Sequence, residues 1–403
     1  MAFAGGAVTF KRFAVQGGLL DRVDDELLER LAAYAIDADS IQTADRTAYG
    51  WVTGEHILDT RFDLAKNVVA DGLHFGLRVD TNKPPADLVR SYQRINEEAM
   101  LKADGRDFLS KPQRREAREK AMSQADAEAR RGAFRRMKQL PAFWDLKRSE
   151  VYLGGASPTA VEHFMTLFHT TFDRAVTPLT AGEMAARWAM KVGEASAFDD
   201  CRPAHFISPP EGADPDGDLV NPAEGRSRDF LGTEWLTWLW YASHVESPTL
   251  NVGQGRSVTV LFEKSLQLEC AFGLGGTLSI TADGPTRLPE TPVALAGGKR
   301  PVRAGLQVAV SGDTFGLTVR GDAMNFTGLR LPPPEADNVT PRAVFEERIE
   351  HLRHLIDAVD GLYAAFLKKR LSSKWSQTLS AMRNWIAVGR QGNDDSIELT
   401  AAS

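Results

Sequence analysis

The most distinctive chemistry in this chain comes from basic side chains concentrated between positions 111 and 138. This segment, KPQRREAREKAMSQADAEARRGAFRRMK, holds ten Lys and Arg and four Asp and Glu, in a 403-residue chain of formal net charge −6. Guanidinium and ammonium groups at such density attract and neutralise phosphates. A long basic rod suits DNA better than a small acidic metabolite. The predicted DNA-binding residues of the segment are Lys111, Arg114, Arg115, Arg118, Lys120, Arg130, Arg131, Arg135, Arg136 and Lys138.

The spacing of these residues predicts how they would act. Arg114, Arg115 and Arg118 lie three and four positions apart, as Arg131 and Arg135 do, so each set can share a helix face. Such a face contacts phosphates without reading bases, which predicts salt-dependent binding that is indifferent to sequence. The sequence also leaves open that this helix is only a solvated charged surface.

Other residue types capable of chemistry are sparse. His351 and His354 lie three apart on a predicted helix, but the sequence indicates no third metal ligand. Segment 214–225 begins with alternating Asp residues like a calcium loop, yet its twelfth position is a glycine in place of the required glutamate. Cys201 and Cys270 are too few for a disulfide scaffold. We therefore expect no metal, no cofactor and no disulfide.

Catalytic and base-stacking patterns are also weak. No Ser-His-Asp or Cys-His arrangement is recognisable, and the Gly-rich pieces lack the ending of a phosphate-binding loop. Trp235, Trp238, Trp240 and Tyr241 could stack on unpaired bases. The leucines between them make a buried core helix or a subunit contact the preferred interpretation.

The elements that position the basic residues follow from periodicity and punctuation. Strand patterns at 8–15 and 74–80 alternate with an amphipathic helix at 24–36. A charged helical stretch then follows the Pro84-Pro85 pair, and Ser110 with Pro112 predicts the start of the basic helix. Because this stretch has little apolar content, we expect it to project from the body as an arm.

The second half reads as a sheet followed by a helix. A buried helix at 230–243 precedes five strand candidates, and a long amphipathic helix covers 342–369. The strand candidates are SVTVLFE, LQLECAF, TLSITA, GLQVAVS and FGLTVRG. The predicted class is α+β, with mixed or antiparallel sheets, amphipathic helices and a projecting charged helical arm.

The predicted domain organisation has four parts. Residues 1–82 and 140–205 form a central α+β domain, and 83–139 form the basic arm. The Pro-, Gly- and Asp-rich segment 206–228 is a linker, and 229–403 form an α+β base domain with the C-terminal helix. No apolar run is long enough for a membrane span, so we expect a cytoplasmic protein with no membrane partner.

The order of several motifs resembles the recombination-associated protein RdgC family along most of the chain. The chain departs from shorter members by an insertion over about 206–263. The motifs that carry the resemblance are FKRFAV at 10–15, GWV at 50–52, LRVDTNKPP at 77–85, AFRRMKQLPAFWDL at 133–146 and GGKRPVRAGLQVAVSGDTFGLTVRGD at 297–322.

This resemblance implies a non-enzymatic, nucleoid-associated protein. Members form a ring-shaped homodimer, bind duplex DNA through the hole and restrain recombinase filaments. Phe134 matches the position of the tip contact that closes the ring, and Lys299 and Arg300 match a Gly-Lys segment that adds secondary DNA-binding candidates. The sequence leaves two rivals open, a metal-dependent nuclease and a docking surface for an acidic protein.

Overall fold

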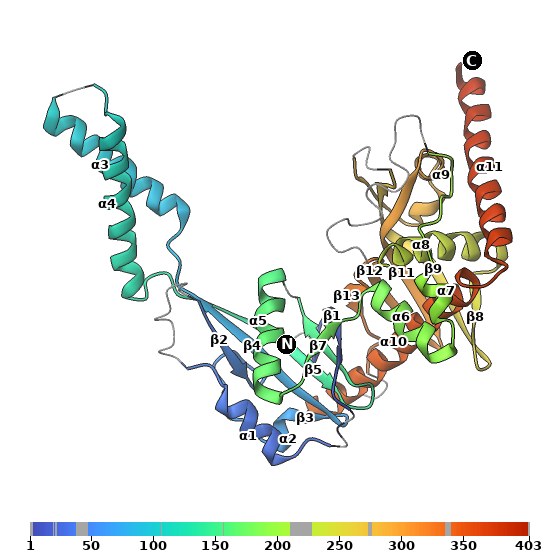
Figure 1. Ribbon diagram of the computed structural model, residues 1–403, viewed down its shortest axis with the longest axis horizontal. Helices are drawn as coiled ribbons and strands as arrows, with labels where there is room; N and C mark the ends of the chain where they lie inside the picture. The colour runs from blue at the N-terminus through green and yellow to red at the C-terminus, as the bar shows by residue number, and fades with distance from the viewer. Residues whose placement is uncertain are drawn as a thin grey trace.

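The computed structural model describes residues 3–401 with gaps at 19, 21, 38–46, 106, 156, 210–227, 273–275 and 335–339, and describes only the backbone from 389 to 401. Figure 1 shows a U-shaped chain, in which helices α3 (Ala86–Asp104) and α4 (Lys111–Arg130) project at one end and α11 (Trp375–Ala401) stands at the other. The predicted α+β class is confirmed, with 45% helix and 28% strand.

The N-terminal half alternates short helices with strands around the projecting hairpin. Its elements are β1 (Val8–Val15), α1 (Asp25–Ala33), β2 (Thr47–Val52), α2 (Leu64–Asn67), β3 (Val68–Val69), β4 (Gly72–Thr81), the α3–α4 hairpin, β5 (Arg136–Asp145), β6 (Glu150–Gly154), α5 (Pro158–Phe172), β7 (Val176–Pro178), α6 (Ala181–Val192) and α7 (Ala195–Asp199).

The C-terminal half begins with a helix, continues as a sheet and ends in two long helices. Its elements are α8 (Phe230–Tyr241), a π-helical turn (Ala242–Glu246), β8 (Thr249–Gly253), β9 (Arg256–Cys270), β10 (Leu278–Ala282), a 3-10 turn (Pro285–Arg287), α9 (Glu290–Ala296), β11 (Lys299–Val310), β12 (Asp313–Arg320), β13 (Asn325–Arg330), α10 (Pro341–Arg370) and α11.

All of these strands belong to one 13-stranded sheet that crosses both halves. Its main path runs β10-β9-β11-β12-β13-β1-β6-β5-β4-β2. Strand β1 joins the halves, because Phe10 pairs antiparallel with Gly154 of β6 and with Phe326 of β13. The predicted boundary at 206–228 therefore separates two parts that share a continuous sheet, and residues 210–227 of that linker lie outside the described part.

Two hydrophobic clusters cover the sheet. One packs α1 and α5 on the strands of the N-terminal half, with Trp51, Trp144 and Phe168 fully or almost fully buried. The other surrounds α8, of which every residue from Phe230 to Tyr241 is buried, and it also includes Phe10 of β1. This second cluster therefore spans both halves, as the sheet does.

Helix α10 fastens the halves together through ion pairs. Buried Arg12 of β1 binds Glu150 at 3.0 Å and Asp360 of α10 at 2.6 Å. Arg353 of α10 binds the fully buried Asp145 of β5 at 2.7 Å. Arg12 and Arg353 are thus each matched by a carboxylate, so removing one partner would leave a buried charge uncompensated.

Two features of the second half differ from expectation. The candidates SVTVLFE and LQLECAF belong to the single strand β9, and the polar break between them is a bulge where Lys264 has φ of 65°. A second long helix, α11, follows α10, which the sequence patterns did not reveal. Among the described residues, no helix combines the length and apolarity needed to cross a bilayer.

Candidate nucleic-acid interface

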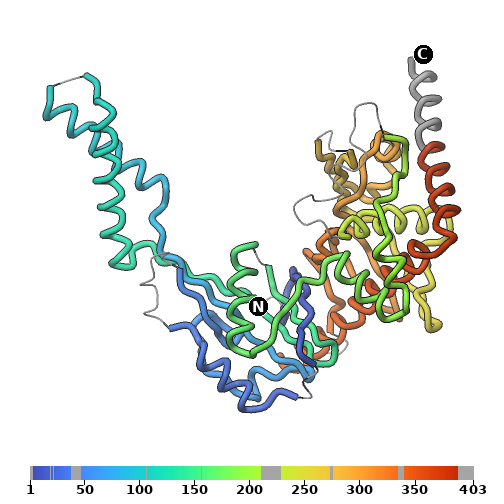
Figure 2. The backbone as a smooth tube through the Cα atoms, viewed as in Figure 1, coloured from blue at the N-terminus to red at the C-terminus, as the bar shows by residue number. Residues whose placement is uncertain are grey.

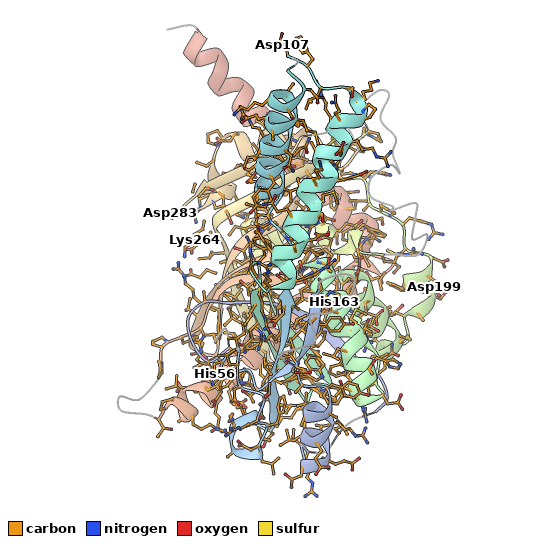
Figure 3. All side chains as sticks on the ribbon, turned by 90° about the vertical axis from the view of Figure 1, so that its left-hand side faces the viewer. His56, Asp107, His163, Asp199, Lys264 and Asp283 are labelled. Atoms are coloured by element: carbon orange, nitrogen blue, oxygen red, sulfur yellow. The ribbon has the colours of Figure 1, made fainter. Side chains whose placement is uncertain are left out.

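Helices α3 and α4 form a projecting hairpin, and the basic segment supplies its second helix as far as Arg130. Arg131 and Arg135 lie beyond the end of α4, so the predicted helix face that they would share does not form. Ser110 caps α4: its hydroxyl accepts from the Gln113 backbone N–H, and the Gln113 side chain accepts from the Ser110 N–H, which together form a capping box. Helix α3 ends at Gly105, whose left-handed φ of 60° lets the chain reverse. Asp107 marks the far end of this arm in Figure 3.

Small residues on α4 hold the hairpin together. None of the residues of α3 is buried, so the contact depends on α4 approaching closely. Polar ties support it: the Tyr92 hydroxyl donates to Glu128 at 2.6 Å, and Asn96 donates to the Ala117 carbonyl at 3.2 Å. The residues of α4 that are buried against α3 are spaced by four: Ala117, Ala121, Ala125 and Ala129.

Charge is divided unequally between the arm and the rest of the chain. Residues 83–138 hold fifteen Lys and Arg against nine Asp and Glu, a net charge of +6, which leaves −12 for all other residues. The arm is therefore a local source of positive potential on an acidic molecule. Such a distribution favours approach of a polyanion to the arm alone.

Ion pairs distinguish the cations of α4 from one another. Arg115 binds Glu119 at 2.9 Å and Lys120 binds Glu116 at 2.8 Å, so their charges are partly satisfied. The hydrogen bond to Glu119 raises the pKa of Arg115.

Three other α4 cations are more available to a ligand. Lys111, Arg114 and Arg118 are exposed, and none of the ion pairs within the described residues involves them. They are spaced by three and four and share a helix face. This trio is the strongest phosphate-binding candidate of the arm.

At the root of the arm, one predicted cation has a structural role. Arg135 donates to the fully buried Asp80 at 2.9 Å, and Arg78 binds the same carboxylate at 2.6 Å. Arg135 therefore fastens the arm to β4. The neighbouring cations Arg130, Arg131, Arg136 and Lys138 are exposed and continue the basic surface onto β5.

The predicted tip residue is not at the tip. Phe134 is half-buried in the turn between α4 and β5, at the root of the hairpin, because α3 and α4 are joined at the opposite end. The phenylalanine at that reversal is Phe108, which is 81% exposed. The sequence does contain a signal for this position, because Phe108 is an aromatic residue just before the helix cap Ser110.

The secondary DNA-binding candidates lie far from the arm, in β11. Arg300 is only 4% exposed, stacks 4.9 Å from the Phe206 ring centre, and burial lowers its pKa to about 10. Lys299 donates to the carbonyl of Gly276. Arg300 is consequently a core residue that no phosphate can reach, which corrects the expectation from the Gly-Lys motif.

Two further sequence candidates remain, the tryptophan-rich helix and the possible calcium loop. Trp235, Trp238 and Trp240 are 0%, 2% and 1% exposed, which confirms the core interpretation. The possible calcium loop at 214–225 falls in the part of the chain that is not described.

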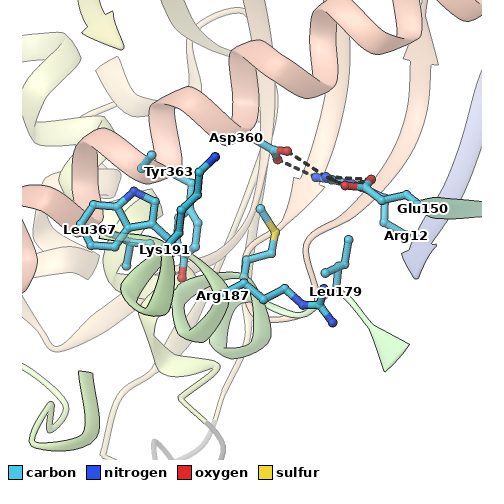
Figure 4. A pocket seen from close by; sticks show the side chains of 11 residues that line it. Arg12, Glu150, Leu179, Arg187, Lys191, Asp360, Tyr363 and Leu367 are labelled. Atoms are coloured by element: carbon cyan, nitrogen blue, oxygen red, sulfur yellow. Dashed lines mark hydrogen bonds and ion pairs between the residues drawn. The ribbon is translucent and has the colours of Figure 1, made fainter. Parts of the chain in front are cut away.

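A pocket of about 310 Å³ lies between β1, α6 and α10 (Figure 4). Its charged wall is Arg12 with its partners Glu150 and Asp360, while Arg187 and Lys191 come from α6. Burial raises the pKa of Glu150, although Arg12 opposes that effect. The charged groups of this wall are already paired with one another, which indicates a role in stabilising the fold and not in catalysis.

Comparison with known proteins yields no match, either to a protein-family model or to a curated sequence. The fold and the site define an α+β protein with a continuous antiparallel sheet and a projecting basic helical hairpin.

Proposed function

We propose that this chain binds duplex DNA without sequence specificity, in the manner of the RdgC family that its motifs resemble. The observation that carries the proposal is the exposed trio Lys111, Arg114 and Arg118, on one face of an arm whose net charge is +6. Long flexible cations at helical spacing meet a phosphate backbone and carry no information about the bases.

The proposed assembly is a ring-like homodimer that encircles the duplex. Its support is the U-shaped backbone in Figure 2, where the arm and the C-terminal half rise on the same side of the central sheet. A two-fold axis would bring two such shapes together and double every phosphate contact. The exposed Phe108 at the end of the hairpin supplies an apolar group for the tip contact.

The proposed mechanism is occupancy. A ring on DNA keeps recombinase filaments from the duplex and makes or breaks no bond, so the protein would modulate recombination as a nucleoid-associated, cytoplasmic component. Closing the ring would slow dissociation more than it strengthens any single contact.

The test is binding of a fluorescent random-sequence duplex over a salt series, with magnesium present and DNA length checked afterwards. We expect intact DNA and a linear fall of log affinity with log salt, of about 0.9 per phosphate engaged. Absence of binding at low salt would refute the proposal. Magnesium-dependent cleavage would favour the nuclease instead.

The ring itself needs a separate test. We expect Phe108→Ser to lower the dimer fraction in sedimentation and to shorten the lifetime of the complex on closed circular DNA. Leu58→Ser is the matched control, because Leu58 is 64% exposed but lies in the body. Equal behaviour of the two variants would remove Phe108 from the contact.

A further inference from the structure

Three potential metal ligands converge where the β11–β12 hairpin meets α10. Asp313 is the first residue of β12, directly after a tight turn in which Ser311 and Gly312 have φ of 53° and 94°. His351 and His354 lie one turn apart on α10. One ligand atom from each of the three side chains lies within 4.8 Å of the other two. The fold thus supplies the third ligand that the sequence did not indicate.

His351 is held in an orientation suited to a ligand. It is 7% exposed, and its Nδ1 lies 3.2 Å from Asp313 Oδ2. Its Nε2 is buried without a hydrogen-bond partner and lies 3.6 Å from Glu347 Oε1. In the metal-free ring Nδ1 donates to Asp313, because a carboxylate only accepts. Metal binding at Nδ1 would place the ring proton on Nε2, which faces Glu347, and a second ring N–H directed at a carboxylate is the usual arrangement around a metal-bound histidine.

The donor set selects the kind of ion. Two imidazoles and one carboxylate suit zinc, whereas magnesium and calcium favour sites made of oxygen ligands. Zinc bonds of about 2.0–2.2 Å require tetrahedral ligands to be separated by roughly 3.4 Å. His354 is exposed, and an inward rotation of its side chain would close the present separation.

We propose that Asp313, His351 and His354 bind Zn²⁺, with a water as fourth ligand and Glu347 orienting His351. The ion would clamp the β11–β12 hairpin onto α10, joining positions 38 residues apart in sequence. Because α10 also carries Asp360 and Arg353, which bind β1 and β5, the clamp would reinforce the helix that connects both halves. The site is independent of the basic arm and of DNA binding.

The first test uses tag-free, chelator-treated full-length protein titrated with Zn²⁺ alone. We expect one ion per chain by calorimetry and a higher Tm with zinc. Both effects should disappear in His354→Ala and Asp313→Asn, which alter side chains that are not buried and should leave the fold intact. His169→Ala, at an exposed helical histidine elsewhere, is the matched control and should bind zinc normally.

The result that overturns the proposal is zinc binding that persists in the two ligand variants, or no zinc binding by the native chain. Cobalt gives an independent readout, because a tetrahedral site with nitrogen ligands produces visible absorption that His354→Ala should abolish. For the orienting role, Glu347→Gln should weaken zinc affinity by roughly tenfold to a hundredfold. Unchanged affinity would exclude Glu347 from the site.

Discussion

The helices of the arm and helix α8 differ in how much of their surface is buried. Every residue of α8 is buried, and its tryptophans pack against α10 and α11, where Trp235 meets Tyr363 and Trp240 meets Trp385. Helix α3 has no buried residue at all, and α4 buries a line of alanines. Residues on the surface of the arm can therefore be substituted with little loss of stability, whereas residues of α8 cannot.

This difference separates the expected effects of mutation. Substitutions in the core should change stability and leave the proposed DNA-binding surface of the folded molecules unchanged. Substitutions on the arm should change affinity and leave the body intact.

The largest effect is expected for Trp235→Ala. Removing a fully buried indole leaves a cavity beside Tyr363 and should lower the free energy of unfolding by about 3–5 kcal/mol. Denaturant titration measures the change. Met122→Ala, at a half-exposed position of α4, should alter it by less than about 1 kcal/mol. Similar losses of unfolding free energy in both variants would contradict the contrast between core and arm.

The second prediction concerns pH. Burial lowers the pKa of His74 to about 4, while the unfolded chain has the ordinary value near 6.5. The unfolded state alone takes up this proton between those values, so stability is complete above pH 6.5 and falls by about 3 kcal/mol as pH drops to 4. His74→Leu should flatten the profile over that interval.

The arm has a different pH response, which supplies the control. Its cations are Lys and Arg, which stay charged throughout that interval. While the body remains folded, DNA affinity should therefore vary little with the titration of His74. A parallel fall of affinity and stability would show that the body takes part in binding.

The third prediction tests the trio directly. Changing Lys111, Arg114 and Arg118 to Glu should weaken duplex binding about a hundredfold, equivalent to about 2.8 kcal/mol, with an unchanged circular dichroism spectrum. Changing Arg22, Arg256 and Lys264 to Glu alters the net charge equally at exposed positions of the body. Equal losses would mean that net charge, and not the arm, governs binding.

The smallest effect is expected for Ser110→Ala. Loss of the capping box should destabilise the start of α4 by about 1 kcal/mol, which faster amide exchange in its first turn would report. The Tm of the body should stay unchanged. Ser123→Ala, at an exposed mid-helix position, removes the same hydroxyl without a cap and should not accelerate exchange.

Local features were predictable from the sequence. Ser110 and Pro112 located the start of α4, and the apolar helix at 230–243 was correctly assigned to the core. The polar break in β9 was misread as a strand end because a bulge and a turn have similar composition. Opposite this bulge an added Cβ on Gly305 would lie 2.1 Å from the Glu263 carbonyl oxygen, a constraint visible only in the paired sheet.

Long-range contacts explain what the sequence could not show about the site. In the sequence, Arg300 and Arg135 look like any other basic residue. Their structural roles follow only from their partners in the fold, Phe206 for Arg300 and Asp80 for Arg135. The same limit hid Asp313, whose proximity to His351 depends on how a hairpin docks on a helix.

The root of the arm has a mechanical consequence. Both hairpin helices continue into neighbouring strands, β4 and β5, which pair with each other from Leu73–Trp144 to Thr81–Arg136. Tension along the arm would pull β4 and β5 in the same direction, along their own axes. Both strands would then slide past their outer neighbours, β2 and β6. Sliding loads the hydrogen bonds of a ladder simultaneously, whereas peeling breaks them one at a time. A load applied to the arm would therefore be transmitted into the whole sheet before the arm came loose.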